Sequence, residues 1–574
     1  MSGHRTERWL WLVFLGLAFA AVAPVFRYPG LFPQSYDWRY FSSWIEVGRR
    51  SLLWFHQVPL WNPYGCGGEV LLANPQSMVA SPLAFLPLAF GTALGLKLSL
   101  VVYYFCAFDG MYRLARSYQV SLPGALLASV LFGAGGWLAL HISSGHANFA
   151  SAALFPYLIV FYRLATQGKA SWTIPLGAVA AWIVCDGGTS TPAMAAVLLA
   201  SFAVIDAIAL RSARPFLALF LGGLSAAAFS AFRLLPALQF AIDHPRRQFE
   251  TDSTTIWQML RDGYWWRGLQ PVPGKRYWFH EYGWRLSYVT PPLIVWSLRV
   301  KRTRSLWIIA AVGAAIVAGD AIPYGPWWLL EQLPLFRDLR VPSRYAILFA
   351  LAFPLLCAAA FDDLRARFAT RSWARPVATA IVVLAALDGL AFDWYCFHDT
   401  FNTEMIVAGR DTPFHQVKGD WRLMMSDVMA GHGVIGCDEE APLQRAARLD
   451  EGPGPQVKLD AASEAGAGTV REASWSPNRV DVEVALSKPA TVLFNQNWNE
   501  HWKSTRGEIV KWGEKWPADR DGGRLAVAAP AGRYTLSVYY RPGTFVVGAF
   551  ISGVALPVLL GLFAILRRKD RAIT

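Results

Sequence analysis

Long apolar runs separated by short polar segments make up most of this chain. Each run extends over roughly 17–22 residues, the length that a helix needs to cross the ~30 Å hydrocarbon core of a bilayer. The pattern predicts an all-α polytopic membrane protein with about twelve transmembrane helices. These helices are expected near residues 9–26, 96–111, 121–140, 147–163, 172–186, 190–210, 215–235, 286–299, 305–320, 343–361, 376–394 and 544–566.

Basic residues in the short loops predict how these helices are oriented. Lysine and arginine collect on the cytoplasmic side of membrane proteins. The basic loops of this chain lie at residues 113–116, 163–169, 211–214, 299–304, 365–375 and 567–571. If these loops are cytoplasmic, both termini are cytoplasmic too. Three long segments are then extracytoplasmic, at residues 27–76, 236–285 and 395–543.

The last of these long segments changes from a helical to a strand pattern. Apolar and polar residues alternate with a period of two at 480–484, 490–494, 524–527 and 534–539, which is typical of half-buried strands. We therefore expect three parts. They are a transmembrane domain at residues 1–394, an extracytoplasmic domain at 395–543 that is β-sandwich-like from about 475, and a final helix with its tail at 544–574.

Composition and charge agree with a membrane protein and argue against other classes. Of the 574 residues, 54% are hydrophobic, and the formal net charge is +13. The basic residues lie in loops between apolar runs and form no patch on a soluble face, so we expect no nucleic-acid partner. The six cysteines include no CxxC pair. Cys396 and Cys437 share one outer segment, and whether they pair is left open.

The first outer loop contains candidate residues for sugar recognition. Asp37 lies about ten residues beyond the first helix, next to Trp38. Aromatic rings, amides and tight turns are the groups that bind sugar rings and hydroxyls. The alternative is an interfacial aromatic belt with a solvated Asp37. The candidate substrate-binding residues of this loop are Trp61, Asn62, Tyr64, Glu69 and Asn74.

Further polar residues lie at the outer ends of later helices. Candidates for substrate contact there are His141, His146, Asn148, Asp186, Glu281 and Tyr282. The two histidines with Asp37 or Glu281 could bind a divalent metal. The first loop has no Asp-x-Asp pair, however, and hydrogen-bonded histidines are commoner, so we predict no metal.

Three arginines precede the helix expected near residue 343. Arg337, Arg340 and Arg344 are spaced i, i+3, i+7, which would put them on one face of a helical segment. Arginines at a helix amino terminus bind phosphate through guanidinium and backbone N–H groups. The alternative is that they reach for lipid headgroups. These arginines lie on the predicted extracytoplasmic side, whereas most basic residues of the chain lie in the predicted cytoplasmic loops. This position favours phosphate binding.

Several stretches of this chain together resemble the YfhO-like family of bacterial membrane proteins, which belongs with the GT-C class of integral-membrane glycosyltransferases. The resemblance implies a many-helix GT-C-like fold in the bacterial inner membrane, a polyprenyl-phosphate sugar donor, and an acid in the first outer loop as catalytic base, the place of Asp37. Residues 400–470 depart from the family pattern. The matching stretches are PLWNPYGCGGEVLLANPQ, SGHANF, FRDLRVPSRY, WSPNRVDVEV, NWNEHW and PAGRYTLSVYYRPGTF.

The expected function is therefore an inverting sugar transfer on the extracytoplasmic face. The lipid-linked donor and membrane lipids are the expected partners, with a cell-envelope glycan, lipid or protein as acceptor. Asp37 would take the acceptor's proton, and Arg340 and Arg344 would stabilise the leaving phosphate. The alternatives are a transporter or flippase of lipid-linked glycans and a non-catalytic envelope scaffold. Transporters place ionisable residues at mid-bilayer, whereas mid-span positions here are almost entirely apolar.

Overall fold

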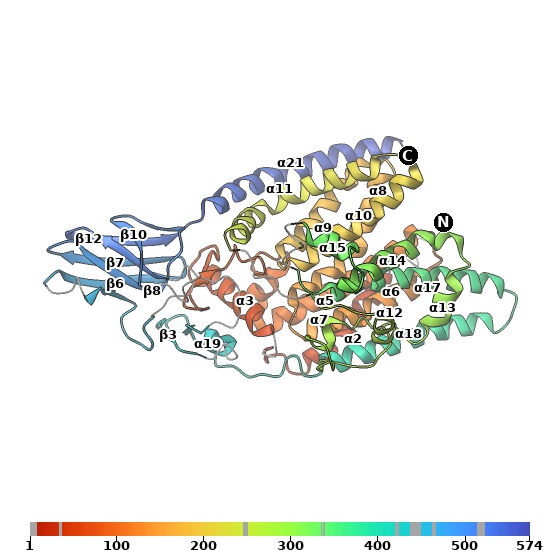
Figure 1. Cartoon of the computed structure of the whole chain (residues 1–574), viewed down its shortest axis with the longest axis horizontal. Coiled ribbons are helices and arrows are strands. Elements are labelled where there is room, and N and C mark those ends of the chain that lie inside the picture. Colours follow the sequence, from red (N-terminus) through yellow and green to blue (C-terminus); the bar gives the residue numbers. More distant parts are fainter. Residues whose placement is uncertain are drawn as a thin grey trace.

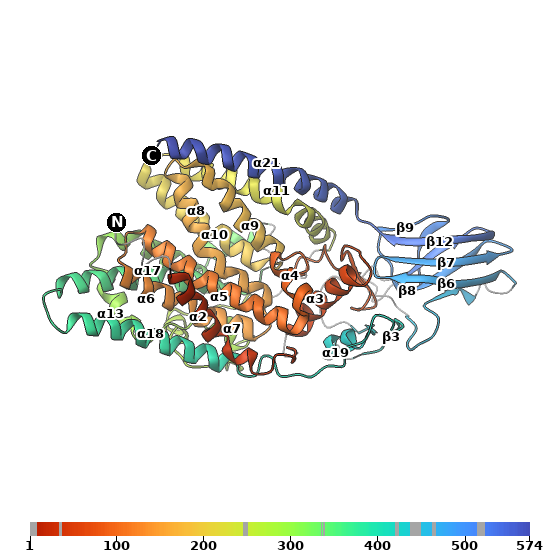
Figure 2. The same ribbon diagram turned by 180° about the vertical axis from the view of Figure 1, so that it is seen from behind.

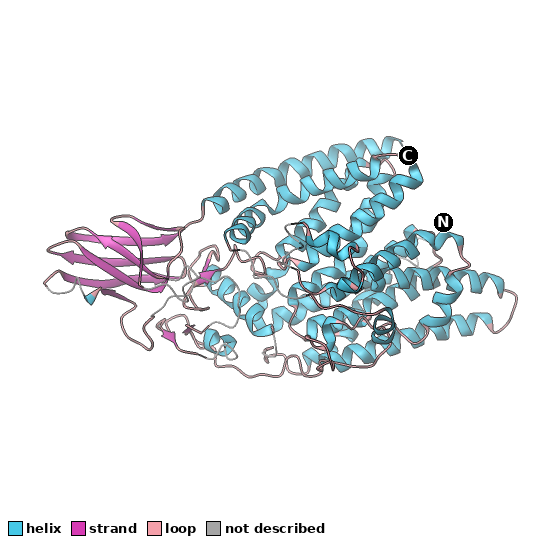
Figure 3. Cartoon of the chain, viewed as in Figure 1, coloured by secondary structure: helices cyan, strands magenta, loops and turns pink. Residues whose placement is uncertain are grey.

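The protein consists of a long helical part with a β-rich part at one end (Figures 1 and 3). A computed structural model describes residues 9–33, 37–244, 251–333, 336, 339–419, 424–436, 449–461, 466–513 and 523–573. The chain ends marked N and C both lie toward the end of the helical part that is remote from the strands (Figures 1 and 2). The prediction of a helical membrane protein with a C-terminal β-sheet region is confirmed.

Eight helical segments of the described residues are long and apolar enough to span a membrane. Their cores are the continuous apolar runs seen in the sequence, so their existence follows from hydrophobicity and length. The segments are α5 (Thr92–Ser117), α6 with α7 (Leu122–Gly133, Gly136–Ser143), η3 with α8 (Ala147–Leu154, Phe155–Thr166), α10 (Ser190–Leu210), α11 (Arg214–Asp243), η8 with α17 (Pro342–Ala346, Ile347–Arg367), α18 (Ala374–Phe397) and α21 (Gly543–Ile573).

The predicted number of twelve spans is not confirmed. Four of the twelve expected helices are present but shorter than a bilayer-crossing helix, because turns or prolines interrupt their apolar runs. They are α2 (Leu10–Ala21), η4 with α9 (Ala170–Trp172, Thr173–Cys185), α13 (Thr290–Ser297) and α14 (Arg304–Val317). Short helices also lie in the connecting segments: η1 (Ala23–Phe26), η2 (Pro82–Ala84), α4 (Phe85–Phe90), α12 (Ile256–Asp262), η5 (Phe279–Glu281), η6 (Lys301–Thr303), η7 (Gly319–Ala321), α15 (Pro326–Glu331) and α19 (Met424–Met429).

The first outer loop contains a helix that the hydrophobic pattern did not predict. This helix, α3 (Trp38–Leu53), carries charged residues among its aromatic ones, yet most of its side chains are buried. Its one acid, Glu46, is fully paired, because Arg50 donates to one of its oxygens at 2.8 Å and Thr92 donates to the other at 2.6 Å. A short hairpin, β1 (Trp61–Asn62) with β2 (Glu69–Val70), follows α3.

The C-terminal strands form two four-stranded sheets with one shared core. Alternate side chains are buried in the strand Arg479–Leu486, as the period-two pattern predicts, whereas nearly every side chain is buried in the strands Ala490–Asn497 and Arg524–Ala529. Val482 pairs with Leu536 in one sheet and Val492 pairs with Val527 in the other. One sheet is β6 (Gly468–Ser476), β7 (Arg479–Leu486), β12 (Gly532–Tyr540) and β9 (Trp502–Ser504). The other is β10 (Glu508–Trp512), β11 (Arg524–Ala529), β8 (Ala490–Asn497) and β5 (Val457–Leu459).

The region before the sandwich is less irregular than its composition indicates. It contributes β5 to a sheet, and it also holds α19 and the parallel pair β3 (Gln416–Val417) and β4 (Gly433–Val434). Cys396 is a buried free thiol, so it forms no disulfide with Cys437, which lies outside the described residues. Cys66, in the first outer loop, is disulfide-bonded instead.

Candidate active site

A small pocket forms where the segment around Asp37 meets the ends of three other helical segments. The side chains come from the start of α3, the η3 region, the turn before α10, and the segment that leads into η8. The pocket therefore collects residues that are up to about 300 positions apart in the sequence. Its lining residues are Asp37, Phe41, Gln76, His146, Asn148, Phe149, Gly188, Thr189, Ser190, Leu339, Arg340 and Arg344.

Glycine at position 145 allows the histidine loop to approach Asp37. Gly145 has a φ of +97°, and a Cβ there would collide with the backbone nitrogens of Asp37 and Trp38. The same approach is fixed by Trp38, whose Nε1 donates to the carbonyl of Ile142 at 2.8 Å. Because His146 follows this glycine directly, its imidazole is carried to the Asp37 carboxylate.

Asp37 and His146 form the polar centre of the pocket. Nε2 of His146 lies 3.3 Å from Oδ2 of Asp37. The Asp37 side chain remains 47% exposed, because its open side faces the pocket. Burial raises the pKa of Asp37, but the hydrogen bond and charge of His146 outweigh it, and the net pKa lies below the ordinary carboxyl value. The carboxylate is thus ionised and open to a bound molecule.

A largely buried ion pair between Arg344 and Glu281 lies next to the Asp37–His146 pair. Arg344 donates to both oxygens of Glu281, from Nε at 2.7 Å and from Nη2 at 2.5 Å, and it also donates to Ser190 Oγ at 3.3 Å. Burial raises the pKa of Glu281, but the charge of Arg344 holds it well below the ordinary value. Burial lowers the pKa of His280, which lies 3.8 Å from Glu281, to about 4. Glu281 is thus fully engaged, and Asp37 is the open carboxylate.

The rings of His146 and Phe149 form one wall of the pocket, and the buried ring of His141 stacks against both. The rings of His141, His146 and Phe149 lie 4.7–5.3 Å apart, and the guanidinium of Arg344 lies 5.1 Å from the Phe149 ring centre. Nδ1 of His141 lies 3.0 Å from Nδ1 of His146. Beside this wall, Oδ1 of Asn148 is buried without a hydrogen-bond partner among the described residues. Such an acceptor fits a hydroxyl donor on a ligand.

The same cluster has the residue types of a metal site. His141, His146 and Glu281 each offer one ligand atom, all within 4.8 Å of one another. Nitrogen and carboxylate donors suit Zn²⁺ and related divalent cations. In the structure these groups bond to one another and to Arg344. The absence of a metal stays a prediction.

Five predicted substrate-binding residues of the first loop lie away from the pocket. Trp61 is buried against the sandwich, where its Nε1 donates to Gln496 at 2.7 Å and its ring contacts Trp502 and Tyr540. The others are also buried, and they bond within the hairpin or pack against its neighbours. These residues are Asn62, Tyr64, Glu69 and Asn74. A role of these five residues in substrate binding stays a prediction.

Of the remaining candidates, His146 and Asn148 line the pocket, whereas His141 and Glu281 are buried next to it and Asp186 and Tyr282 also lie outside it. Asp186 is fully buried and accepts from Tyr103 at 2.8 Å, and Tyr282 donates to Asp252. Arg337 lies outside the described residues. Arg340 lines the pocket together with Arg344.

Sequence reasoning missed several lining residues. Two of them, Gln76 and Ser190, lie two and four residues beyond the predicted candidates Asn74 and Asp186. Gly187 and Gly188 have φ of +75° and +82°, and a Cβ on either would strike Gln76 or Asn148. The paired glycines were the available signal that these segments meet. The sequence does not identify the apolar lining residues Phe41, Phe149 and Leu339 as part of a site, because apolar residues are common throughout the chain.

Comparison with known proteins gives no family assignment. No family model and no curated protein matches this sequence. The YfhO-like resemblance therefore stays a prediction.

Among solved structures, similar chains include AftD and ArnT. The arabinofuranosyltransferase AftD from Mycobacteria matches with a TM-score of 0.45 at 12% identity, over 94% of this chain and 40% of that one. ArnT from Cupriavidus metallidurans bound to undecaprenyl phosphate matches with a TM-score of 0.40 at 12% identity, over 74% of this chain and 77% of that one. Its apo form gives 0.44 at 11% identity. This chain spans about two fifths of the length of AftD.

Proposed function

We propose that the protein transfers a sugar from a polyprenyl-phosphate donor to an extracytoplasmic acceptor, with inversion at the anomeric carbon. One observation carries the proposal: a single pocket holds an open, ionised carboxylate, Asp37, together with two arginines, Arg340 and Arg344. A base on one side and cations on the other are what a displacement with a phosphate leaving group requires.

In this proposal Asp37 is the general base. Its carboxylate would accept the proton of the acceptor hydroxyl as that oxygen attacks the anomeric carbon. His146, at 3.3 Å, orients the carboxylate and balances its charge. The engaged state of Glu281 makes that residue a weaker candidate, since both of its oxygens accept from Arg344.

Arg344 and Arg340 would stabilise the departing lipid phosphate. Guanidinium groups bind phosphate oxygens through paired N–H donors and do not lose their charge. The contact of Arg344 with Phe149 and Glu281 holds the group in place before a donor arrives. The unpartnered Oδ1 of Asn148 would accept from a sugar hydroxyl.

The pocket lies where a lipid-linked donor can reach it. Arg344 stands at the beginning of a helical segment that is long enough to span the bilayer, Pro342–Arg367. A polyprenyl tail beside the helices would therefore place its phosphate near the arginines. The disulfide of Cys66 supports an extracytoplasmic first loop, because disulfides persist in oxidising compartments.

The donor class gives a direct test. We expect purified protein to transfer sugar from polyprenyl-phosphate sugars and not from nucleotide sugars. Shortening the polyprenyl chain should weaken binding without changing the choice of sugar, because each buried CH₂ contributes about 0.8 kcal/mol. A radiolabelled transfer assay with both donor classes measures this. Transfer from a nucleotide sugar without lipid would contradict the proposal, and no transfer from either class would favour a transporter or a scaffold.

Membrane orientation can be tested with single cysteines. Lys503, exposed on the sandwich, and Lys301, exposed on the connection before α14, are suitable positions. With a membrane-impermeant maleimide on intact cells, we expect labelling of Lys503→Cys but not of Lys301→Cys. Lys301→Cys should react only after the membrane is opened. Labelling of Lys301→Cys in intact cells would invert the proposed topology.

A further inference from the structure

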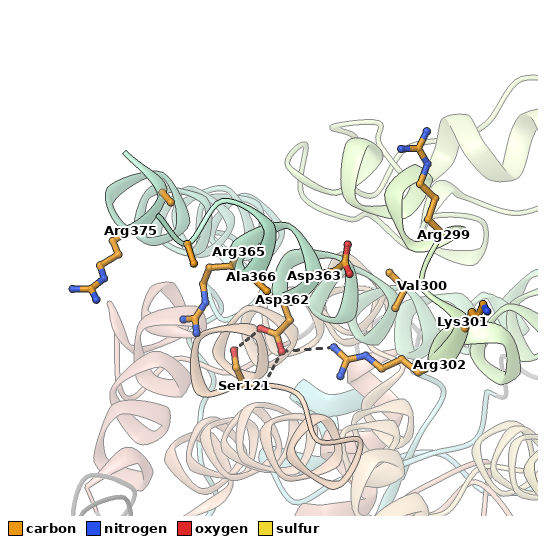
Figure 4. Close-up of a pocket in the computed structure, with 12 residues that line it drawn as sticks. Ser121, Arg299, Val300, Lys301, Arg302, Asp362, Asp363, Arg365, Ala366 and Arg375 are labelled. Atoms are coloured by element: carbon orange, nitrogen blue, oxygen red, sulfur yellow. Dashed lines mark hydrogen bonds and ion pairs between the residues drawn. The ribbon is translucent and has the colours of Figure 1, made fainter. Parts of the chain in front are cut away.

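A second and larger cleft lies at the other end of the helix bundle. It is formed by the connection between α13 and α14, the end of α17 and the start of α18, and its volume is about 830 Å³ (Figure 4). Arg344 and Arg365 are separated by 21 positions of one helical segment, so they lie about 32 Å apart at ~1.5 Å per residue. That distance equals the thickness of a hydrocarbon core. The cleft and the Asp37 pocket therefore face opposite membrane surfaces.

The cleft carries an excess of positive charge. Its lining includes five basic side chains, Arg299, Lys301, Arg302, Arg365 and Arg375. In Figure 4, Arg302 and Arg365 lie beside Asp362 and Ser121, whereas the side chains of Arg299 and Arg375 extend away from them at the rim of the cleft. Five cations within one cleft repel one another and attract a polyanion.

The acids of the cleft are already bonded to other groups. Asp362 accepts from the backbone N–H of Ser121 at 2.6 Å and also from its hydroxyl, and it lies 3.8 Å from Arg302. Asp363 accepts from the indole of Trp296 at 2.9 Å. Within the described part of the chain, Lys301, Arg365 and Arg375 form no ion pair. Three cations thus remain available to an anion.

The surroundings of the cleft are those of a lipid-facing site. Helix α18, which contributes Arg375, continues with exposed apolar side chains, including Val377, Leu384 and Leu387. At the turn between α17 and α18, the rings of Phe368 and Trp373 pack at 5.3 Å and both are exposed. Aromatic residues of this kind gather at the membrane–water interface. An occupant of the cleft would therefore have apolar chains next to its charged group.

We propose that this cleft binds the phosphate headgroup of an anionic phospholipid, with the acyl chains lying along α18. The basic side chains hold the phosphate through charge-assisted hydrogen bonds. Soluble phosphate compounds would use the same cations but would leave the apolar surface of α18 uncovered. This binding is independent of sugar transfer.

Native mass spectrometry with defined lipids tests the site. The probes are phosphatidylglycerol and phosphatidylcholine, added to delipidated protein in detergent. We expect phosphatidylglycerol to bind preferentially, and the triple variant Lys301→Gln/Arg365→Gln/Arg375→Gln to weaken that binding roughly 10- to 100-fold, as three basic residues near a phosphate would. The control is Arg211→Gln/Arg214→Gln/Lys569→Gln, which removes the same charges from exposed positions elsewhere and should change binding less than about threefold.

Three outcomes would overturn the proposal. Equal losses in the two triple variants would mean diffuse attraction to the basic face. Displacement of phosphatidylglycerol by millimolar inorganic pyrophosphate would mean a soluble polyanion site. A second measurement on the unaltered protein guards against misfolding of the variant: photoactivatable phosphatidylglycerol should crosslink within residues 299–302 or 365–375. Crosslinks only elsewhere would also overturn the proposal.

Discussion

Asp37→Asn is expected to lower the rate of sugar transfer by about 10²–10⁴-fold, the usual contribution of a general base. The amide keeps the size of the side chain but cannot accept the proton. Because the carboxylate is partly exposed to the pocket and bonded to one histidine, its replacement should leave the fold intact. The comparison of kcat for the two proteins in detergent, with thermal unfolding measured in parallel, tests this expectation.

The matched control is Asp252→Asn. Asp252 belongs to the middle outer loop, where it pairs with Lys275 at 3.2 Å and accepts from Tyr282, away from the pocket. This variant should retain kcat within a few-fold. Near-normal transfer by Asp37→Asn would exclude Asp37 as the base and direct attention to Glu281.

The pH dependence of transfer gives a separate readout for Asp37. The pKa of this carboxyl lies below its ordinary value, chiefly because the hydrogen bond and charge of His146 outweigh burial. A base acts while it is ionised, so kcat/KM should stay level from neutral pH down past the ordinary carboxyl range. It should fall only as pH drops through the lowered pKa. An acidic limb above the ordinary value would indicate a different base.

The long helices could be predicted from sequence because hydrophobicity and length alone specify them. The eight confirmed segments are long apolar runs, and most of them have a basic residue at or near one end. The short helices were harder to judge. Both α13 and α14 are apolar, but Pro291 and Pro292 fix the start of α13 at its first turn, and the turn near Gly319 ends α14. A hydropathy average reports the composition of a stretch of residues. It does not show where a turn interrupts the helix within that stretch.

Helix α3 could not be recognised because its polar residues satisfy one another only in the folded chain. Glu46, Arg50 and Thr92 read as solvent-exposed positions in the sequence, yet they form one buried network. The sandwich strands were the opposite case. In β7 and β12 the alternation of apolar and polar residues has one period and one buried face, so the strands could be placed to within a few residues.

The candidate site was predictable where a motif combined glycine with polar residues. The stretch Ser144-Gly145-His146 was singled out because a polar turn between apolar helices needs a reason, and it contacts Asp37. The aromatic stretch around Trp61 has an equally suggestive composition. Its side chains are buried against the sandwich, however, and recognition surfaces and domain interfaces use the same residue types.

Replacement of Arg344 should affect both stability and transfer, and the two effects can be separated. Arg344 is 21% exposed and pairs with Glu281, which is 4% exposed. Arg344→Gln leaves that buried carboxylate without its cation, so the free energy of unfolding should fall by about 3–5 kcal/mol. Loss of the phosphate contact should lower kcat by a further 10²–10³-fold or so per folded molecule, as removal of one charge-stabilising donor does.

The double variant Glu281→Gln/Arg344→Gln distinguishes the structural role of Arg344 from its role toward phosphate. Removing both charges restores neutrality, so much of the stability lost in Arg344→Gln should return. Transfer should not return, because the cation that faces the leaving phosphate is still absent. Glu281→Gln alone keeps that cation and should retain kcat within about tenfold. Recovery of transfer together with stability in the double variant would show that Arg344 serves only the fold.

A matched ion pair outside the pocket completes this test. Arg285 is 2% exposed and pairs with Asp388 at 2.7 Å. Arg285→Gln should destabilise the protein by an amount similar to Arg344→Gln, because it also leaves a largely buried carboxylate, that of Asp388, without its cation. Its transfer rate per folded molecule should stay near that of the unaltered protein. Since the two variants lose the same charge and comparable stability, a large difference in kcat between them isolates the contribution of the Arg344 guanidinium to the chemistry.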